Sequence, residues 1–238
     1  MITHAIRTTW DGTPLPPTER AIVQVIDAGD ALRLLVFAPF HDDPAPTAPP
    51  GPTPGLWEFE VVEWFLAGSD GRYLEVELGP RGHHLVLRLN GVRTVVEQAL
   101  PMSTTTRRCG RSWWSGTADI PRAWVPPGPH AANAYRIHGQ GPARRYDAST
   151  PLPGPKPDYH QPARFDAVTL PAVRESTDPR ALLVARLVAM LDLTPEQAAR
   201  AVEIARPAPD DLGSWTVSVL QALGIHREDD RANPDPIG

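Results

Sequence analysis

Residues 56–66 read LWEFEVVEWFL, which is the alternating pattern of a β-strand. Successive side chains of a strand point to opposite faces, so Trp57, Phe59, Val61, Glu63 and Phe65 would share one face. Glu63 therefore stands where the alternation requires an apolar side chain. A buried carboxylate needs a partner or stays protonated, so we expect Glu63 to be buried or semi-buried, on the concave side of the sheet, and held by a cationic or hydroxyl partner.

The two segments that follow extend this strand into a three-stranded meander. Residues 72–78 and 83–89 alternate in the same way, and glycine-containing turns join them. Glu75 and Glu77 would lie on the outward face of 72–78. The hairpin register decides whether either of them meets Glu63, because a slip of one residue reverses the answer. The residues expected to form inward rows are Leu74, Val76, Leu78, Leu85, Leu87 and Leu89.

Short strand-like segments recur along the first 170 residues, at 3–9, 21–26, 31–38, 113–120, 133–138 and 165–170. Regular short strands separated by turn signals predict a mainly β fold, and we expect one antiparallel, jelly-roll-like β-sandwich. The proline-rich stretch 41–55 has few backbone donors. We therefore expect it to be a long surface connection that does not join a sheet.

After residue 175 the apolar residues recur at helical spacing. Asp178 before a proline predicts one helix start, a capping box from Thr194 to Gln197 predicts a second, and a third helix is expected from about Asp211 to Gly224. The domain prediction is a sandwich over 1–175, three helices over 176–226 and a disordered tail over 227–238. Helices this short are too small to be stable alone, so we expect them to dock on the sandwich.

The composition excludes several classes of function. The chain has 238 residues, a formal net charge of −5 and a single cysteine, Cys109. Without an apolar run long enough for a membrane span or a broad basic surface, we expect no membrane and no nucleic-acid partner. We expect a soluble, cytoplasmic protein that lacks disulfides. No metal or haem motif is present in the sequence, so no metal ligand and no cofactor is assigned.

Five segments carry a resemblance to known proteins: LWEFEVVEWFL, RYLEVELGPRGHHLVLRL, WWSGTADIP, NAYRIHG and KPDYH. They resemble a family of uncharacterised proteins whose domain is similar to the family-nine carbohydrate-binding modules and to the wider DOMON-like β-sandwiches. The resemblance covers most of residues 1–170 and excludes the helical region. It implies a sandwich fold and, for some relatives, a sugar or haem site on one sheet or at its rim.

The residues assigned to a ligand site are the types that contact sugars, namely flat aromatic rings, carboxylates and histidines. Two alternatives stay open for Glu63: a structural ion pair with an arginine such as Arg88, or a hydrogen bond to a ligand hydroxyl. The adjacent Trp113 and Trp114 cannot both point inward, so one of them should be exposed or covered by the helices. The assigned ligand-binding residues are Trp10, Trp57, Glu63, Glu75, His138, Tyr146, Asp158 and His160.

Three functional hypotheses remain open at this stage. The first is a module that binds a small molecule, such as a carbohydrate. The second is an enzyme of unknown reaction with Glu63 and either His138 or His160 as an acid–base pair, although the sequence identifies no catalytic residue. The third is a protein-interaction unit in which the helices present an apolar groove.

Overall fold

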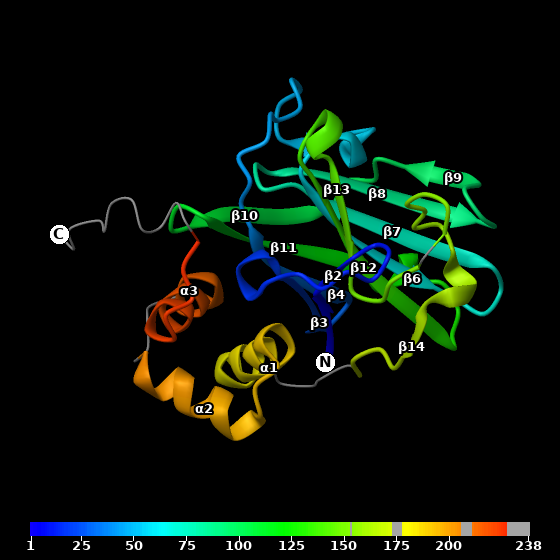
Figure 1. The fold of residues 1–238 in the computed structure, drawn as a ribbon. Helices are drawn as coiled ribbons and strands as arrows, with labels where there is room; N and C mark the ends of the chain where they lie inside the picture. The colour runs from blue at the N-terminus through cyan, green and yellow to red at the C-terminus, as the bar shows by residue number, and fades with distance from the viewer. Residues whose placement is uncertain (153, 173–177, 206–210, 228–238) are drawn as a thin grey trace.

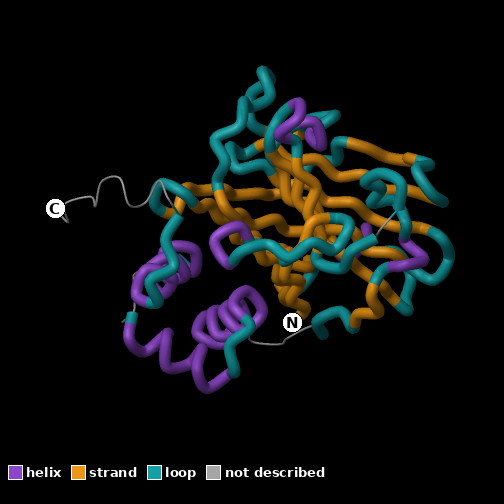
Figure 2. Tube along the Cα trace, viewed as in Figure 1, coloured by secondary structure: helices purple, strands orange, loops and turns teal. Residues whose placement is uncertain are grey.

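Two β-sheets and a group of three helices make up the fold in the computed structural model (Figures 1 and 2), which describes residues 1–152, 154–172, 178–205 and 211–227. The first sheet has five strands in the order β1 (Ile2–Ile6), β3 (Ala21–Ala28), β4 (Ala31–Pro39), β11 (Trp113–Pro121) and β10 (Ser103–Cys109). All of its pairings are antiparallel.

The second sheet has nine strands. Its main path runs β2 (Thr8–Thr9), β13 (Arg145–Ala148), β12 (His130–His138), β6 (Val61–Ala67), β7 (Arg72–Leu78), β8 (His83–Asn90) and β5 (Gly51–Pro52). Two further strands pair off this path, β14 (Asp166–Val168) with β12 and β9 (Val95–Gln98) with β8. Apart from the short β5–β8 pair, the pairings are antiparallel, so the predicted antiparallel sandwich is confirmed.

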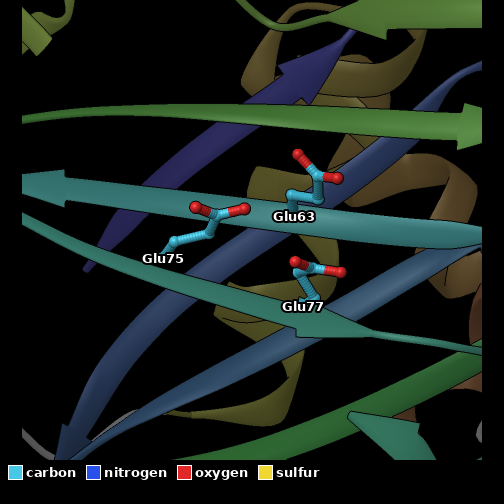
Figure 3. Close-up of side chains that lie close together, drawn as sticks. All are labelled: Glu63, Glu75 and Glu77. Atoms are coloured by element: carbon cyan, nitrogen blue, oxygen red, sulfur yellow. The ribbon is translucent and has the colours of Figure 1, made fainter. Parts of the chain in front are cut away.

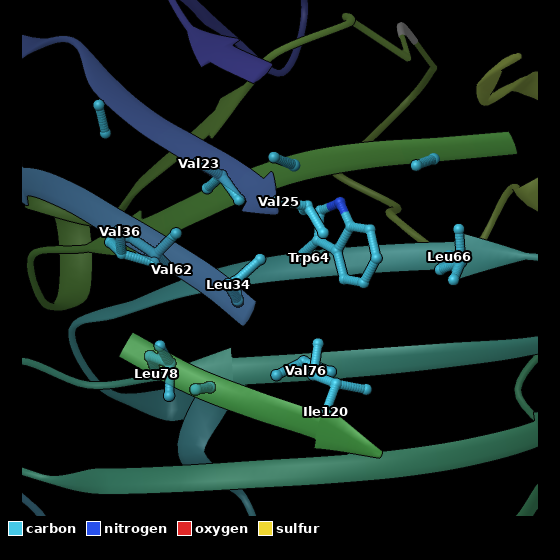
Figure 4. Close-up of a cluster of buried hydrophobic side chains, with 14 of the residues drawn as sticks. Val23, Val25, Leu34, Val36, Val62, Trp64, Leu66, Val76, Leu78 and Ile120 are labelled. Carbon is cyan, nitrogen blue, oxygen red and sulfur yellow. The ribbon is translucent and has the colours of Figure 1, made fainter. Parts of the chain in front are cut away.

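The main apolar core lies between the two sheets (Figure 4). Trp64 of β6 is fully buried there, as expected from its place in the alternation. Each fully buried aliphatic or aromatic side chain contributes about 1.5–3 kcal/mol, so this layer is the principal source of stability. The labelled members of the core in Figure 4 are Val23, Val25, Leu34, Val36, Val62, Trp64, Leu66, Val76, Leu78 and Ile120.

The opening strand is shorter than the sequence pattern predicted. A 3₁₀ helix occupies Leu56–Glu58, after Gly55 in the left-handed region (φ 77°), and β6 begins only at Val61. The prediction that Trp57 and Phe59 belong to the row of Glu63 was therefore wrong. The turn places Trp57 beside the sheet rather than in it.

The meander register corrects a second expectation. Leu74, Val76 and Leu78 face the five-stranded sheet, whereas Leu85, Leu87 and Leu89 face the opposite side. The two rows are therefore not on one inward face, because Leu85 pairs with Glu77 and Leu87 with Glu75. A second apolar cluster, which includes Tyr135, Tyr159 and Phe165, covers part of that opposite face.

The proline-rich stretch does join a sheet, contrary to the prediction. Gly51 and Pro52 form β5, which runs parallel to the start of β8. The Gly51 N–H donates to the Gly82 carbonyl at 3.1 Å and the Thr53 N–H donates to the His84 carbonyl at 2.8 Å. Non-proline residues on either side of Pro52 supply the donors, and the proline sits at a sheet edge where none is needed.

Besides β5, three more strands were not predicted: β9, β10 and β13. Strand β10 reads STTTRRC and is mostly exposed, so no apolar alternation marks it. Both tryptophans that follow are buried, as expected for a pair in which one is covered by helices. Trp114 lies between the sheets, and Trp113 lies under the helices.

The three helices cover the outer face of the five-stranded sheet (Figure 1). Their bounds are α1 (Pro179–Leu191), α2 (Pro195–Ile204) and α3 (Leu212–Ala222). The predicted caps at Asp178, Thr194 and Asp211 are confirmed by side-chain hydrogen bonds to Arg180, Gln197 and Ser214 backbone N–H groups. No helix of the described residues is long and apolar enough to cross a membrane.

A buried polar contact joins the helices to the sheet. Arg186 of α1 donates from Nη2 to the Gln24 side-chain oxygen at 3.0 Å and from Nη1 to Thr216 of α3 at 2.9 Å. Gln24 of β3 in turn donates to the Leu182 carbonyl at 2.9 Å. The domain boundaries at 175 and 226 stay predictions, and the expected tail falls almost wholly on 228–238, outside the described residues.

We expect Gly213→Ala to loosen this docking. A Cβ at Gly213 would lie 2.6 Å from Cys109 Sγ and 2.7 Å from Ser115 Oγ, both on the sheet. Overpacking of this kind costs about 1–3 kcal/mol, and urea unfolding should show the loss of stability. Gly154→Ala is the matched control, because its Cβ would meet only the Lys156 carbonyl at 3.7 Å. Equal stability of the two variants would contradict tight docking.

Candidate ligand-binding site

A pocket of about 380 Å³ lies on the face of the nine-stranded sheet that is turned away from the five-stranded sheet. Its floor comes from strands β6, β7, β8 and β12, and the segment around Tyr159 and the turn before β6 form its walls. The residues that line it are Trp57, Glu63, Phe65, Glu75, Leu87, Leu89, Arg93, Val95, Ile137, Tyr146, Pro157, Asp158, Tyr159 and His160.

Three carboxyl groups stand side by side in the floor (Figure 3). In the β6–β7 register Glu63 is opposite Glu77 and Phe65 is opposite Glu75, so all three glutamates project from the same face. One oxygen of each lies within 4.8 Å of one oxygen of each of the others. The register question left open by the sequence is thus answered: both glutamates of β7 meet Glu63.

All three glutamates are almost completely buried, with exposed fractions of 2% for Glu63, 3% for Glu75 and 0% for Glu77. Burial, followed by the neighbouring carboxyls, raises the pKa values of Glu63 and Glu77 well above the ordinary range. Burial also raises the pKa of Glu75 to about 7, opposed by a hydrogen bond from Glu77 and by Arg93. A protonated Glu77 that donates to an ionised Glu75 explains why this hydrogen bond raises the pKa of Glu77 and opposes the rise in the pKa of Glu75.

The expectation that a cationic or hydroxyl side chain, such as Arg88, holds Glu63 was wrong. Arg88 forms an ion pair with Glu97 instead, since it projects from the other face of β8. No arginine, lysine or hydroxyl of the described residues donates a hydrogen bond to Glu63, and Arg144 acts on it only through its electric field. Glu63 is nevertheless buried, as predicted, and it lies on the face of the nine-stranded sheet that is turned away from the five-stranded sheet.

A hydrogen-bonded chain orients His160 at the edge of the carboxyl cluster. The Arg93 backbone N–H donates to the Tyr73 hydroxyl at 2.9 Å, and that hydroxyl lies 2.8 Å from His160 Nδ1. His160 Nε2 is then directed toward Glu75, 3.9 Å from its Oε2 atom. Burial and the charge of Arg93 lower the pKa of His160 to about 4, so the ring is neutral at pH 7.

Trp57 forms one wall of the pocket and keeps an exposed fraction of 41%. Arg144 fixes the backbone of this turn by donating to the carbonyls of Trp57 and Glu58, the latter at 2.8 Å. The same guanidinium lies 5.8 Å from the ring centroid of Tyr146, which also lines the pocket. One arginine therefore positions two aromatic walls.

Asp158 is at the rim, where its carboxylate forms an ion pair with Arg93 at 2.7 Å and accepts the His160 backbone N–H at 3.0 Å. The second contact caps the backbone of the turn that contains Asp158 and His160. Because Asp158 and Arg93 neutralise each other, the net charge facing the pocket comes mainly from the floor.

Six of the eight residues assigned from the sequence line this one pocket: Trp57, Glu63, Glu75, Tyr146, Asp158 and His160. That they bind a ligand stays a prediction. The structure brings them together from a 3₁₀ turn, three strands and a loop. Their convergence depends on pairings between segments far apart in the chain.

His138 and Trp10, the other two residues assigned to the ligand site, lie outside this pocket. Ile137 lines the pocket, so strand alternation turns His138 to the opposite face, where its Nε2 is 3.4 Å from Asp147 and its ring stacks on His41. Trp10 follows the edge strand β2 and lines a neighbouring hollow of about 220 Å³ on the other side of Tyr146.

The sequence assignment missed Glu77, Tyr73, Arg93 and Tyr159. Glu77 follows Glu75 by two residues and so shares its face, and this signal was present in RYLEVEL. Arg93 and Tyr159 come from loops that contain no periodic pattern. No spacing rule could have placed them in the pocket.

The arrangement favours binding chemistry of two kinds. Carboxyl groups, a neutral imidazole and aromatic faces can hold a polyhydroxylated molecule. Among the described residues, Glu63, Glu75 and Glu77 are also the group whose ligand atoms are close enough to share a metal ion.

We expect Glu77→Gln to stabilise the protein when a chelator is present. Glutamine keeps the volume and the hydrogen-bond donor to Glu75 but cannot ionise, so at a pH where Glu77 would lose its proton the gain should be about 1–3 kcal/mol, the cost of an unpartnered buried polar group. The folded pKa of Glu75 is about 7 and that of Glu77 is also raised well above the unfolded value near 4.5, so both groups contribute most to stability below pH 4.5. The contribution of Glu75 is lost as the pH rises through about 7, and that of Glu77 falls in the same direction.

The gain in Tm from Glu77→Gln should therefore be larger at pH 8 than at pH 5. Glu97→Gln is the matched control, because Glu97 is on the surface in a pair with Arg88. A Tm that falls at pH 8 on Glu77→Gln would contradict the view that the three carboxyls strain the fold.

Comparison with solved structures supports the fold. The chain resembles the crystal structure of a candidate carbohydrate-binding protein from Bacteroides uniformis, with a TM-score of 0.56 and 16% identity over 70% of this chain and 84% of that one. A family-nine carbohydrate-binding module from Caldicellulosiruptor kristjanssonii, solved with cellotriose, matches at a TM-score of 0.40 and 12% identity, over 66% of this chain and 78% of that one, which is too low to establish a shared fold.

Comparison with protein sequences identifies the family, although no family model matches the chain. The UPF0462 protein C4orf33 homolog of Danio rerio is 40% identical over 177 residues, which cover 71% of this chain and 89% of the relative. The human UPF0462 protein C4orf33 is 41% identical over 164 residues, which cover 65% of this chain and 81% of the relative. The chain therefore belongs to the UPF0462 (C4orf33) family.

Proposed function

We propose that the protein binds a small carbohydrate, or a similar polyhydroxylated molecule, in the pocket above β6 and β7. The observation that carries this proposal is the pairing of a half-exposed tryptophan with buried carboxyl groups inside one cavity of about 380 Å³. Sugar rings have apolar faces and hydrogen-bonding edges, so they require both kinds of surface in one site.

The polar groups match the edges of a sugar ring. A hydroxyl both donates and accepts hydrogen bonds, and a cluster that contains protonated and ionised carboxyls can do the same. Glu63 and Glu75 face the cavity, and the neutral imidazole of His160 adds a further group beside Glu75. The ring of Trp57 offers the apolar face, with its backbone held by Arg144.

The comparisons support this proposal at the level of the fold. The Bacteroides uniformis structure that shares the fold is described as a candidate carbohydrate-binding protein. The members of the UPF0462 family reported above carry no function in their names. The assignment of a ligand to this chain therefore rests on the geometry of the pocket.

An enzyme is the second candidate, because Glu75 and His160 approach each other to 3.9 Å and have pKa values shifted in opposite directions. Glycoside hydrolysis, however, uses two carboxyl groups that flank the bond from opposite sides. Here the three glutamates lie together on one side of the cavity, and the rim carboxylate of Asp158 is paired with Arg93. This arrangement favours binding over hydrolysis.

The interaction-unit hypothesis gains little support. The apolar faces of the helices pack on Ile22, Phe37 and Trp113 of the five-stranded sheet. Ile204 and Leu223 are the large apolar side chains of the described helical region that remain exposed, and they are far apart in sequence. Scattered exposed side chains do not make a docking groove.

The test is a saccharide screen by ligand-observed NMR on the full chain, followed by titration of the best ligand into Trp57→Ala. Loss of the apolar ring that the sugar would cover costs about 1.5–3 kcal/mol, so the Kd should rise at least tenfold. The matched control is Trp10→Ala, which removes an equal ring from the neighbouring hollow. Its Kd should stay within twofold of the original.

Two results would overturn the proposal. One is a Trp57→Ala variant that binds the saccharide as tightly as the unaltered chain. The other is the absence of any saccharide binding at millimolar concentration. Release of a reducing end during incubation, lost in Glu75→Gln and in His160→Gln, would instead establish the enzyme.

A further inference from the structure

The three carboxyl groups in the floor of the pocket are buried, and no cationic side chain of the described residues forms an ion pair with them. Apart from the shared proton between Glu77 and Glu75, no side chain or backbone N–H of the described residues donates to either carboxyl oxygen of Glu77, although the side chain is fully buried. The Oε2 atom of Glu75 is likewise buried and without such a donor. Figure 3 shows the Glu77 carboxyl on the same side of the strands as those of Glu63 and Glu75, close to both.

The nearby cations are bound elsewhere. Arg93 pairs with Asp158, and Arg144 donates to the backbone carbonyls of Trp57, Glu58 and Gly139. A protein that only required stability would fill these positions with apolar side chains, because a buried, unpartnered carboxylate is expensive. A bound cation is the partner that would satisfy all three groups together.

We infer that Glu63, Glu75 and Glu77 form a Ca²⁺ site in the floor of the pocket. The separation of their oxygen atoms is within the reach of one ion. Oxygens bound to one Ca²⁺ at 2.3–2.6 Å can be at most about 4.6–5.2 Å apart, and the three ligand atoms lie within 4.8 Å of one another. Mg²⁺ requires near-ideal octahedral geometry and keeps several of its waters, so three carboxyl groups on one face of a sheet suit Ca²⁺ better.

The donor set and its surroundings also suit Ca²⁺. Carboxylate oxygens are the ligands that Ca²⁺ prefers, and they can bind in mono- or bidentate fashion. Glu63 and Glu75 open onto the pocket, which gives the ion a path of entry and room for coordinated water. The three side chains come from two paired strands in fixed register, so their positions depend on the sheet rather than on a loop.

The site goes beyond the proposed function, because it requires no saccharide. The bound Ca²⁺ would face the cavity, where the hydroxyl groups of a saccharide could replace water in its coordination shell. No metal was assigned from the sequence, because the spacing of the three glutamates matches no cation-binding motif.

The experiment is isothermal titration of Ca²⁺ alone into the full, chelator-treated chain at pH 7.5. We expect one Ca²⁺ per chain, with at least tenfold weaker binding of Mg²⁺. Glu77→Gln should weaken Ca²⁺ binding at least tenfold, and Glu63→Gln should do the same. Glu97→Gln, the same substitution at an exposed carboxylate on β9, should leave the Ca²⁺ affinity within twofold.

Circular dichroism of each variant shows whether it is folded, and Glu77→Asp provides a second variant that keeps the charge but withdraws the carboxylate. The inference is overturned if the unaltered chain binds no Ca²⁺ at millimolar concentration, if folded Glu77→Gln binds it equally well, or if Mg²⁺ binds as tightly. Ca²⁺ binding without any saccharide binding would leave this site standing and overturn the proposed function. Saccharide binding in chelator without Ca²⁺ binding would do the reverse.

Discussion

The pairing of β6 with β7 is the constraint on which the pocket depends. Glu63 is opposite Glu77 and Phe65 is opposite Glu75, so every carboxyl group of the two strands projects from one face. The side chains of Val62, Val76 and Leu78 project from the other face, into the core between the sheets. A shift of one residue would place the glutamates in the sandwich core. The apolar layer between the sheets thus fixes the register, and the register assembles the acidic floor.

The two outer faces of the sandwich have different coverings. Three helices close the outer face of the five-stranded sheet, through apolar packing and the contact between Arg186 and Gln24. The outer face of the nine-stranded sheet is covered only in part, by Tyr159 and Phe165, and the remaining space is the pocket. The helices and the pocket therefore belong to opposite sides of the molecule, and the helical region contributes stability rather than a lid.

Burial of three carboxyl groups opposes folding. The surrounding sheet tolerates them because its other face supplies a continuous apolar core, and because protons can neutralise part of the charge. Buried ionisable groups with shifted pKa values cluster at functional sites, where a bound ligand can offset their cost in folding free energy. The stability that is lost by burying Glu77 is therefore consistent with the binding role proposed for the cavity.

Much of the architecture was determined by the sequence alone. Alternation in 72–78 and 83–89, capping residues at Asp178 and Thr194, and regular strand spacing were sufficient for the antiparallel sandwich and the three helices, because these signals are local. Strand β10 was not predicted because it is a polar, mostly exposed edge strand that needs no apolar pattern. Strand β13 was not predicted because it has only four residues, too few for an alternation to show. The start of β6 was misplaced because the 3₁₀ turn at Leu56–Glu58 has an alternating composition too.

The site was decided by tertiary structure. The sequence identified Glu63 as anomalous but not its neighbours, because hairpin register and the approach of β12 and the 157–160 loop are contacts between distant segments. Local alternation could not reveal that Ile137, rather than His138, faces the cavity until the face of β12 was known. Sequence specifies which side chains share a face of one strand, whereas only packing between strands decides which faces meet and what cavity they leave.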